Sequence, residues 1–385
     1  MNNNTIPNNI TLSEWNMEIT NILLPNIVML SVYLALGTCG NFFVLMVYAF
    51  QMKKQSDERY FIPILAFFDM IATIYLGVHY IFQCFNQTTF SNNILCKTLV
   101  FFVANTTYTS VLILSLLAIQ RYRKVCKPLK PSMSISMKRT ALFLAIILSL
   151  LLALILPFVY GTIPYHSIKH GIVGKRCGRL KDGNAFISTL YSVGTGTLVF
   201  VAVALLVILY CRIMKKVFRS LKIYKNDRSG DKTDIEINEE DANCRDIGCT
   251  DIEMSETKPD FSVGQQDIKS RPESAVSRNR RIMNRRITNK LTFMFFTITT
   301  VFILSYIPKV IVLCLEGIHK DFWENLSNSQ RPAVTFLYHI FIINNIVNPI
   351  IYAFMDIEFR GNAAILLKRM FIKTCFCIGR IQSNV

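Results

Sequence analysis

Charged residues are scarce in this chain of 385 residues. They make up 17% of it, whereas about a quarter of the residues in an average soluble domain are charged. Hydrophobic residues make up 52%, and the mean hydropathy is +0.36. Such a composition over so long a chain excludes a disordered or fibrous protein and argues against a single soluble globule.

Other features that would define a protein class are also missing. Residues 1–20 contain neither a basic segment nor an apolar core, so we do not expect a cleaved signal peptide. The chain shows no internal repeat and no second folded domain. It has no nucleophile–base constellation and no His or Cys cluster with metal-ligand spacing, so we do not expect an enzyme.

The apolar residues gather in seven blocks, each long enough to cross a bilayer core of about 30 Å, which takes about 20 helical residues. Unbroken apolar runs of this length are helical rather than alternating. The sequence therefore predicts an all-α fold, a seven-transmembrane helix bundle with a short amphipathic eighth helix. The blocks are Asn26–Tyr48, Tyr60–Phe82, Ile94–Ala118, Thr140–Tyr160, Ile187–Tyr210, Leu291–Leu315 and Ala333–Phe354.

The predicted helices divide the chain into five parts. Residues 1–25 are an extracellular N-terminal tail, 26–224 carry the first five helices with their loops, and 285–356 carry the last two helices. Residues 225–284 are acidic and poor in aromatic side chains, which predicts a disordered third cytoplasmic loop. Residues 357–385 form the amphipathic helix and a cytoplasmic tail.

The formal charge of +17 by itself suggests nucleic acid. Residues 226–277, however, hold 14 acidic and 6 basic residues, a net of −8, and the rest of the chain carries +25. Lys and Arg crowd the connections that follow the first, third and fifth helices, and none precedes Asn26. The positive-inside rule then places the N-terminus outside a multi-pass plasma-membrane protein. We therefore interpret the basic charge as setting the orientation of the helices and as contacting anionic membrane lipid. We expect no nucleic acid partner.

Short modification motifs agree with this orientation. N-x-S/T sequons that fall on the expected outer side begin at Asn3, Asn9, Asn86 and Asn325. Cys375 and Cys377 follow the basic amphipathic segment Ile357–Ile372 and are candidate palmitoylation sites. Unmodified thiols are the alternative.

Two of the eleven cysteines stand on the expected oxidising side. Cys96 lies at the top of the third helix, and Cys177 lies midway along the loop after the fourth. We expect a disulfide between them that staples this loop across the mouth of the bundle. Two free thiols, or Cys84 as a partner, are the alternatives.

Ionisable residues inside the predicted helices are few, and such residues are costly and usually functional. They are Asp69 in the second helix, Arg121 at the end of the third and Lys309 in the sixth. A carboxylate surrounded by amide and hydroxyl oxygens suits a hard cation, so Asp69 is a candidate Na⁺ ligand. A hydrogen-bonded network without an ion is the alternative, and we expect no other cofactor. The uncharged polar residues that share this interior are Asn41, Ser110, Asn344, Asn345 and Asn348.

Five motifs in order resemble those of rhodopsin-like (class A) G-protein-coupled receptors, over residues 26–372. They are Asn41 in GN, Asp69 in LAFFD, Arg121–Tyr122 in QRYRKVCKP, Pro308 in FILSYIP, and Asn348–Tyr352 in NPIIY. Within that family the RY-x-x-V-C-K-P and SYIP stretches are most similar to invertebrate neuropeptide receptors of the cholecystokinin, orexin or FMRFamide kind.

The resemblance implies a receptor that signals through a heterotrimeric G protein and meets arrestin and a receptor kinase. Arg121 would engage the G protein when the sixth helix swings outward at Pro308, with Tyr210 and Tyr352 moving inward to support it. The polar residues around Asp69 correspond to a sodium pocket that collapses on activation. Such a bundle has two states, and each partner binds one state better. The implied activation switch comprises Arg121, Tyr122, Tyr210, Tyr306, Pro308, Asn348, Pro349 and Tyr352.

The chain departs from the family pattern near Arg121. Gln120 stands where an acidic residue is usual, and Thr288 stands where some relatives carry Glu. We hypothesise raised basal activity; the alternative is that hydrogen bonds from Gln120 and Tyr210 suffice. Tyr306 replaces the usual tryptophan of the sixth helix and remains able to act as an aromatic packing switch.

The ligand class is narrowed by two absences. Val103 stands where amine receptors carry Asp, and Ile342 stands where opsins carry the Schiff-base lysine, so we expect neither an amine nor retinal. The loop after the fourth helix is basic around Arg176, which would concentrate anionic ligands; a merely solvated loop is the alternative.

A buried ammonium at Lys309 needs a partner. Glu316, two turns above, or a carboxylate on the ligand would supply one. The residues we expect to bind ligand are His79, Gln83, Val103, Arg176, Tyr306, Lys309, Tyr338 and His339.

The sequence therefore predicts a cell-surface receptor for an extracellular peptide with an acidic group. A receptor for a small anionic or lipid ligand is the alternative. A transporter or channel is an alternative of a different class, but the inverted repeats and interrupted helices typical of transporters are not evident in the sequence.

Overall fold

The computed structural model describes residues 10–52, 59–167, 169–180, 184–230, 275–319 and 321–382. The sequons at Asn3 and Asn9 and most of the predicted third cytoplasmic loop lie outside these residues. The chain divides into two compact units, Met1–Lys216 with Thr288–Val385, and Val217–Ile287. In the second unit the described residues continue the helices α7 and α8.

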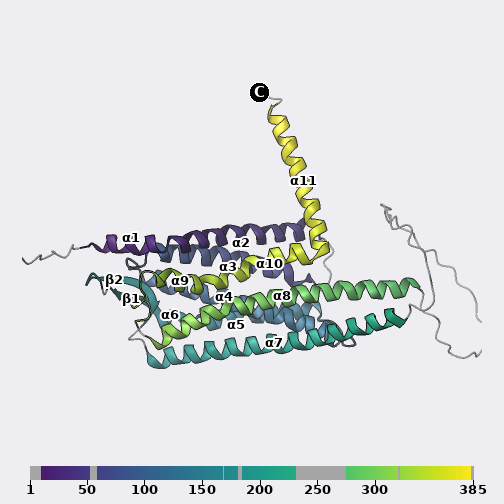
Figure 1. The fold of residues 1–385 in the computed structure, drawn as a ribbon, viewed down its shortest axis with the longest axis horizontal. Helices are drawn as coiled ribbons and strands as arrows, with labels where there is room; N and C mark the ends of the chain where they lie inside the picture. The colour runs from purple at the N-terminus through teal and green to yellow at the C-terminus, as the bar shows by residue number, and fades with distance from the viewer. Residues whose placement is uncertain are drawn as a thin grey trace, which may run out of the picture. The chain divides into compact units, whose positions relative to one another are not determined.

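Seven helical segments in the described part of the chain are long and apolar enough to cross a membrane (Figure 1). They confirm the predicted seven-helix bundle. The spans are formed by α2 (Leu24–Phe50), α3 (Phe61–Phe85), α4 (Asn93–Cys126), α5 (Ile135–Ala153) with α6 (Leu156–Val159), α7 (Ala185–Gly230), α8 (Ala275–Ile318), and α9 (Gln330–His339) with η3 (Ile340–Ile342) and α10 (Ile343–Met355).

Two spans expected as single helices are interrupted. The fourth breaks between α5 and α6, where Pro157 occupies the first turn of α6 and has no N–H to continue the α5 ladder. The seventh contains the 3₁₀ turn η3, which separates α9 from α10. This turn begins directly after His339, a residue that lines the ligand cavity.

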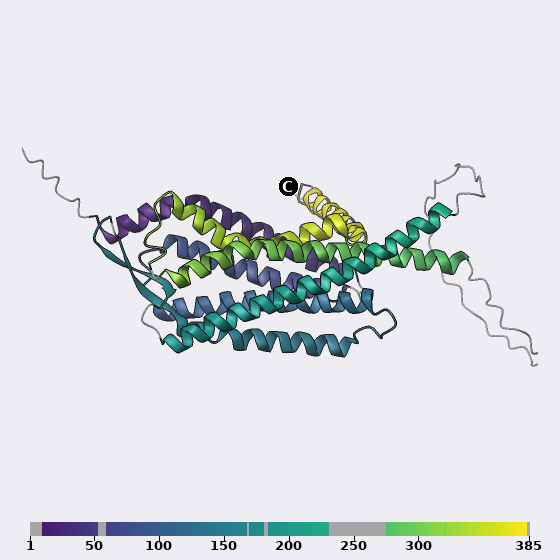
Figure 2. The same cartoon turned by 60° about the horizontal axis from the view of Figure 1, so that its bottom comes forward.

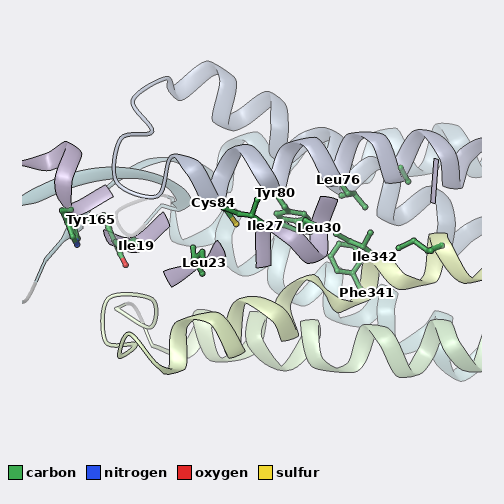
Figure 3. Close-up of a cluster of buried hydrophobic side chains, with 13 residues drawn as sticks. Ile19, Leu23, Ile27, Leu30, Leu76, Tyr80, Cys84, Tyr165, Phe341 and Ile342 are labelled. Atoms are coloured by element: carbon green, nitrogen blue, oxygen red, sulfur yellow. The ribbon is translucent and has the colours of Figure 1, made fainter. Parts of the chain in front are cut away.

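An apolar cluster joins α2, α3 and the 3₁₀ turn η3 in the middle of the last span. Figure 3 shows Leu30, Leu76, Phe341 and Ile342 gathered between these elements, and all four side chains are buried. Close approach of α2 to α3 depends on Gly37, because a Cβ there would stand 2.6 Å from Cγ2 of Thr73. The cluster fixes the wall from which the cavity residues of α3 project.

A short helix, α1 (Leu12–Ile22), occupies the segment that we expected to be an extracellular tail. Thr11 begins it with a capping box, in which its hydroxyl accepts from the Glu14 N–H and the Glu14 carboxylate accepts from the Thr11 N–H. Trp15, Ile19 and Leu23 recur every four residues and are all buried against the bundle. This stripe is too short to be recognised as a span.

The loop after the fourth span is a β-hairpin of β1 (Tyr160–His166) and β2 (Val173–Arg179), which lies beside α1 (Figure 2). A disulfide links Cys96 to Cys177, with Cα atoms 5.5 Å apart, and confirms the predicted staple. We call this end of the bundle the hairpin end. Asn86 and Asn325 both lie here, at the end of α3 and between α8 and α9, and their glycosylation stays a prediction.

At the other end, α11 (Ile357–Gln382) begins where the amphipathic eighth helix was predicted. Phe359, Ala363 and Leu366, spaced by four and three residues, form its buried face. The side chains of Cys375 and Cys377 lie outside the described ones, so palmitoylation stays a prediction.

Candidate ligand cavity and activation region

A cavity of about 410 Å³ lies at the hairpin end, walled by α3, α4, β2, α7, α8 and α9. All eight residues that the sequence analysis selected as ligand-binding line it: His79, Gln83, Val103, Arg176, Tyr306, Lys309, Tyr338 and His339. These side chains come from five elements that are far apart in the chain, and the fold brings them around one space.

Lys309 projects into this cavity from α8, and its side chain is almost entirely removed from solvent, at 7% exposure. Its ammonium Nζ lies 3.3 Å from the centroid of the Phe341 ring and 5.5 Å from that of Tyr338. Cation–π attraction of this kind partly compensates a desolvated ammonium. Among the described residues Lys309 forms no ion pair, so the suggested pair with Glu316 is not formed.

Two buried histidines lie near Lys309, on either side of Tyr80. The ring centroids of His79 and Tyr80 are 4.8 Å apart, and those of Tyr80 and His339 are 4.2 Å apart. The Nδ1 atom of each histidine has no hydrogen-bond partner. An imidazole without a partner retains its capacity to donate or accept a hydrogen bond, so both rings remain available to a ligand.

Aromatic rings hold the arginines at the mouth of the cavity. The Arg176 guanidinium lies 5.2 Å from the Tyr165 ring centroid and 5.9 Å from that of Trp323. Arg331 donates to the Tyr165 hydroxyl, and its other terminal nitrogen donates to the Leu326 carbonyl at 3.2 Å. Tyr165, Trp323 and Arg331 were not selected from the sequence, because they come together only when the hairpin folds over the bundle.

Beside this mouth, Glu18 of α1 binds the hairpin turn. Lys169 Nζ donates to Glu18 Oε1 at 3.0 Å, and His170 Nε2 lies 3.1 Å from Glu18 Oε2. The Lys169 hydrogen bond lowers the pKa of the Glu18 carboxyl, despite partial burial. The contact adds a polar link between α1 and the hairpin.

The wall formed by α4, β1 and α7 carries no charge near the cavity. The Tyr108 hydroxyl is 3.1 Å from Oγ1 of Thr195, and the Tyr191 ring meets that of Tyr160 edge to face, with centroids 6.3 Å apart. Apolar side chains such as Leu198 pack around them. These residues were not selected from the sequence, and they give the cavity an uncharged aromatic wall.

The residues around Asp69 form a buried polar network between α2, α3 and α10. Asn348 Nδ2 donates to Asp69 Oδ2 at 2.6 Å. Asn41 Nδ2 donates to the Asn345 carbonyl at 2.7 Å, and Asn344 Nδ2 donates to Asn345 Oδ1 at 3.4 Å. Ser110 is buried as well.

Four side-chain oxygens of this network have no hydrogen-bond partner. They are the Oδ1 atoms of Asp69, Asn41, Asn344 and Asn348. One carboxylate and three amide oxygens match the donors that a hard cation prefers. The residues therefore fit a Na⁺ ion, which they would hold by these oxygens.

Arg121 is buried at the end of α4 away from the hairpin. Its guanidinium carbon lies 4.3 Å from the centroid of the Phe295 ring on α8. Tyr122, beside it, has the Lys127 Nζ 5.6 Å from its ring centroid. Phe295 was not selected from sequence, although it supplies a direct contact between Arg121 and the helix predicted to move.

The other predicted switch residues lie along α7, α8 and α10. Tyr210 is buried, with its ring 5.9 Å from that of Phe296. Tyr352 packs against Phe359 of α11, with centroids 6.1 Å apart. Pro308 and Pro349 lie inside α8 and α10.

Tyr306 links the cavity to this region. Its ring lies 4.5 Å from that of Phe302 and 5.3 Å from that of Phe341, the ring beneath the Lys309 ammonium. A continuous row of packed aromatic rings thus joins the Lys309 ammonium to Phe302.

Two comparisons place this arrangement among known proteins. The family model described as 7 transmembrane receptor (rhodopsin family) matches residues 40–352. The crystal structure of squid rhodopsin is similar to this one with a TM-score of 0.62 and 15% sequence identity, covering 94% of this chain and 87% of that one. At this identity the structural likeness shows a shared fold alone. The family model, in contrast, matches most of the chain, and the chain therefore belongs to the rhodopsin family of seven-transmembrane receptors.

Proposed function

We propose that this receptor lies in the plasma membrane with its hairpin end outside, binds an extracellular peptide that carries an acidic group, and signals through a heterotrimeric G protein. Family membership itself assigns a multi-pass membrane receptor rather than an enzyme, and it removes the transporter or channel alternative. The peptide, the G protein and the orientation belong to the proposal.

The positive charge of the cavity is the observation from which we infer an acidic ligand. Arg176, Lys309 and Arg331 face a single acidic residue, Glu316, so the lining has a formal charge of +2 with its histidines neutral. A concave, largely aromatic site with a few charged groups is typical of ligand pockets, and excess positive charge favours an anion. Val103 offers no carboxylate to an amine.

A peptide is favoured over a smaller anion because basic residues continue beyond the cavity. Lys175 on β2 is exposed, and Lys169 lies on the hairpin turn. A ligand longer than the cavity would reach them. A small anionic or lipid ligand, which would fill the cavity alone, is the second candidate.

The opposite end supports coupling to a G protein. Arg121 and Phe295 join α4 to α8 there, and a partner that binds the state in which they separate would stabilise that state. Arrestin and a receptor kinase are further proposed partners of this end, because receptors of this family meet both.

The test is a screen of a neuropeptide library on cells that express the full chain, with calcium and cAMP read together. The proposal predicts responses to peptides with an acidic group, and a loss of potency for these peptides in Lys309→Glu. Lys97→Glu, the same change at a residue of the hairpin end that does not line the cavity, is the control. No response to any peptide, or responses confined to peptides without an acidic group, would contradict the assignment.

A further inference from the structure

The cavity contains a cluster of one ammonium and two imidazoles that form no ion pair with any described carboxylate. Lys309, His79 and His339 are 7%, 5% and 4% exposed, and all three line the cavity. We call them the deep basic cluster. The ammonium lies against the rings of Phe341 and Tyr338, and both imidazoles have an Nδ1 atom without a hydrogen-bond partner. A buried ammonium and two imidazoles that line one space can donate hydrogen bonds to an anion.

The cluster lies well below the mouth. His79 is six residues from the end of α3 at Phe85, Lys309 is nine residues from the end of α8 at Ile318, and His339 is nine residues from the start of α9. At a rise of about 1.5 Å per residue, the three groups lie about 9 to 14 Å below the helix ends. An extended peptide covers this depth with about three or four residues.

We propose, building on the peptide-receptor function above, that the deep basic cluster binds the free C-terminal carboxylate of the peptide ligand. A side chain of Asp or Glu is much shorter than the depth of the cluster. For an acidic side chain in the middle of the peptide to reach the cluster, the peptide would have to enter the cavity as a loop, with two chain segments passing through the mouth. A carboxylate at the end of the peptide reaches the cluster with a single segment in the mouth.

The charge of the cluster selects which chain end enters. The amino terminus is a cation and would be repelled by the Lys309 ammonium, whereas the α-carboxylate attracts it and accepts hydrogen bonds from all three side chains. A C-terminal amide is neutral and would leave the ammonium without a counter-charge. The site thus distinguishes a free acid from an amidated peptide.

The mouth arginines are less suited to this role. Arg176 lies against the rings of Tyr165 and Trp323, and Arg331 donates to the Tyr165 hydroxyl and the Leu326 carbonyl. Glu316 also lines the mouth and would oppose a carboxylate there. The mouth is a passage for the peptide, and the deep basic cluster is its anchor.

The experiment uses two matched sets of tetrapeptides that are identical in sequence, one with free C-terminal acids and one with C-terminal amides. The purified full-length receptor in nanodiscs is incubated with both sets, and the captured peptides are identified by mass spectrometry. The proposal predicts that free acids are captured about tenfold or more over their amides, because removing one partner of a buried charge pair strongly weakens binding.

The same capture is repeated with variants. In Lys309→Gln the preference for acids falls to about onefold, and in Lys309→Arg it persists, since the charge remains. Lys97→Gln removes a lysine of α4 that does not line the cavity and keeps the preference. Arg176→Gln also keeps it, because the mouth is not the anchor.

Three results would overturn the proposal. Equal capture of acids and amides by the unaltered receptor removes the carboxylate site and leaves the peptide-receptor function standing. A preference for acids that survives in Lys309→Gln, or that disappears in Arg176→Gln, moves the anchor elsewhere. Capture of neither set removes both this site and the proposed peptide function. If Lys309→Gln does not fold, the acid–amide comparison on the unaltered receptor and on Lys309→Arg still decides.

Discussion

The guanidinium of Arg59 holds the carboxylate of Asp356 through two hydrogen bonds of 2.9 and 3.0 Å across 297 positions of the chain. Both side chains are buried. Asp356 also caps α11, because its Oδ1 accepts from the N–H groups of Glu358 and Phe359 at 3.1 and 3.2 Å. The segment before α3 is thereby tied to the first turn of α11.

Arg59→Gln is expected to destabilise the receptor strongly. Removing one partner of a buried ion pair leaves an uncompensated charge, which costs about 3 to 5 kcal/mol. The measurement is thermal unfolding of the purified receptor in detergent. Arg360→Gln, which removes an exposed arginine from α11, is the control and should shift the midpoint little. A midpoint in Arg59→Gln equal to that of the control would show that the pair contributes nothing.

Phe295→Leu is expected to raise ligand-independent signalling. The ring that faces the Arg121 guanidinium is lost while most of the side-chain volume remains, so the contact between α4 and α8 weakens by about 0.5 to 2 kcal/mol. Because about 1.4 kcal/mol is a tenfold change in an equilibrium, basal activity should rise several-fold.

The assay compares cells with matched surface expression of each variant. Leu304→Ala, which alters a 62% exposed side chain on the same helix, should leave basal signalling unchanged. Basal signalling in Phe295→Leu no higher than in the unaltered receptor would show that this ring does not restrain the resting state.

Asp69→Asn is expected to abolish a specific effect of Na⁺ on stability. If Na⁺ binds the unpartnered oxygens of the network, NaCl raises the unfolding midpoint more than choline chloride at equal ionic strength, because a ligand that binds only the folded state stabilises it. The variant should respond to both salts alike. Glu316→Gln removes a carboxylate of the ligand cavity, outside the network, and should keep the Na⁺ effect. Identical midpoints in the two salts for the unaltered receptor would favour a network without an ion.

The features that could be predicted from the sequence are those in which a single residue has an energetic cost that does not depend on the fold. An ionisable group inside an apolar block, such as Asp69 or Lys309, is expensive wherever the chain folds, so its position alone marks it. The cysteine pair was likewise predictable, because compartment and position left few partners. For the same reason the seven spans follow directly from their length and apolar character.

Features that arise from contacts between distant segments were not predictable. The stripe of Trp15 and Ile19 has meaning only because the hairpin and α3 lie against it, and the alternation of β1 is too short to distinguish from a loop. Phe295 is one aromatic residue among several on α8, and only the fold shows that it faces Arg121. Of the two partners suggested for Lys309, Glu316 was wrong, because helical spacing gives a shared face but not the direction of two side chains.

Trp15→Ala is expected to release α1 from the hairpin while leaving the bundle folded. The Trp15 and Tyr165 rings are stacked, with centroids 5.3 Å apart and planes 5° from parallel, and Trp15 is 6% exposed. An isolated helix of eleven residues is marginal in water, so α1 depends on this packing. Hydrogen exchange of residues 12–22 should become fast in the variant, with protection of α2 and α3 unchanged. Met17→Ala, at a 58% exposed position of the same helix, should leave exchange as it is. Full protection of α1 in Trp15→Ala would mean that its other contacts, including the Asn16 amide to the Phe85 carbonyl at 2.7 Å, are sufficient to hold it.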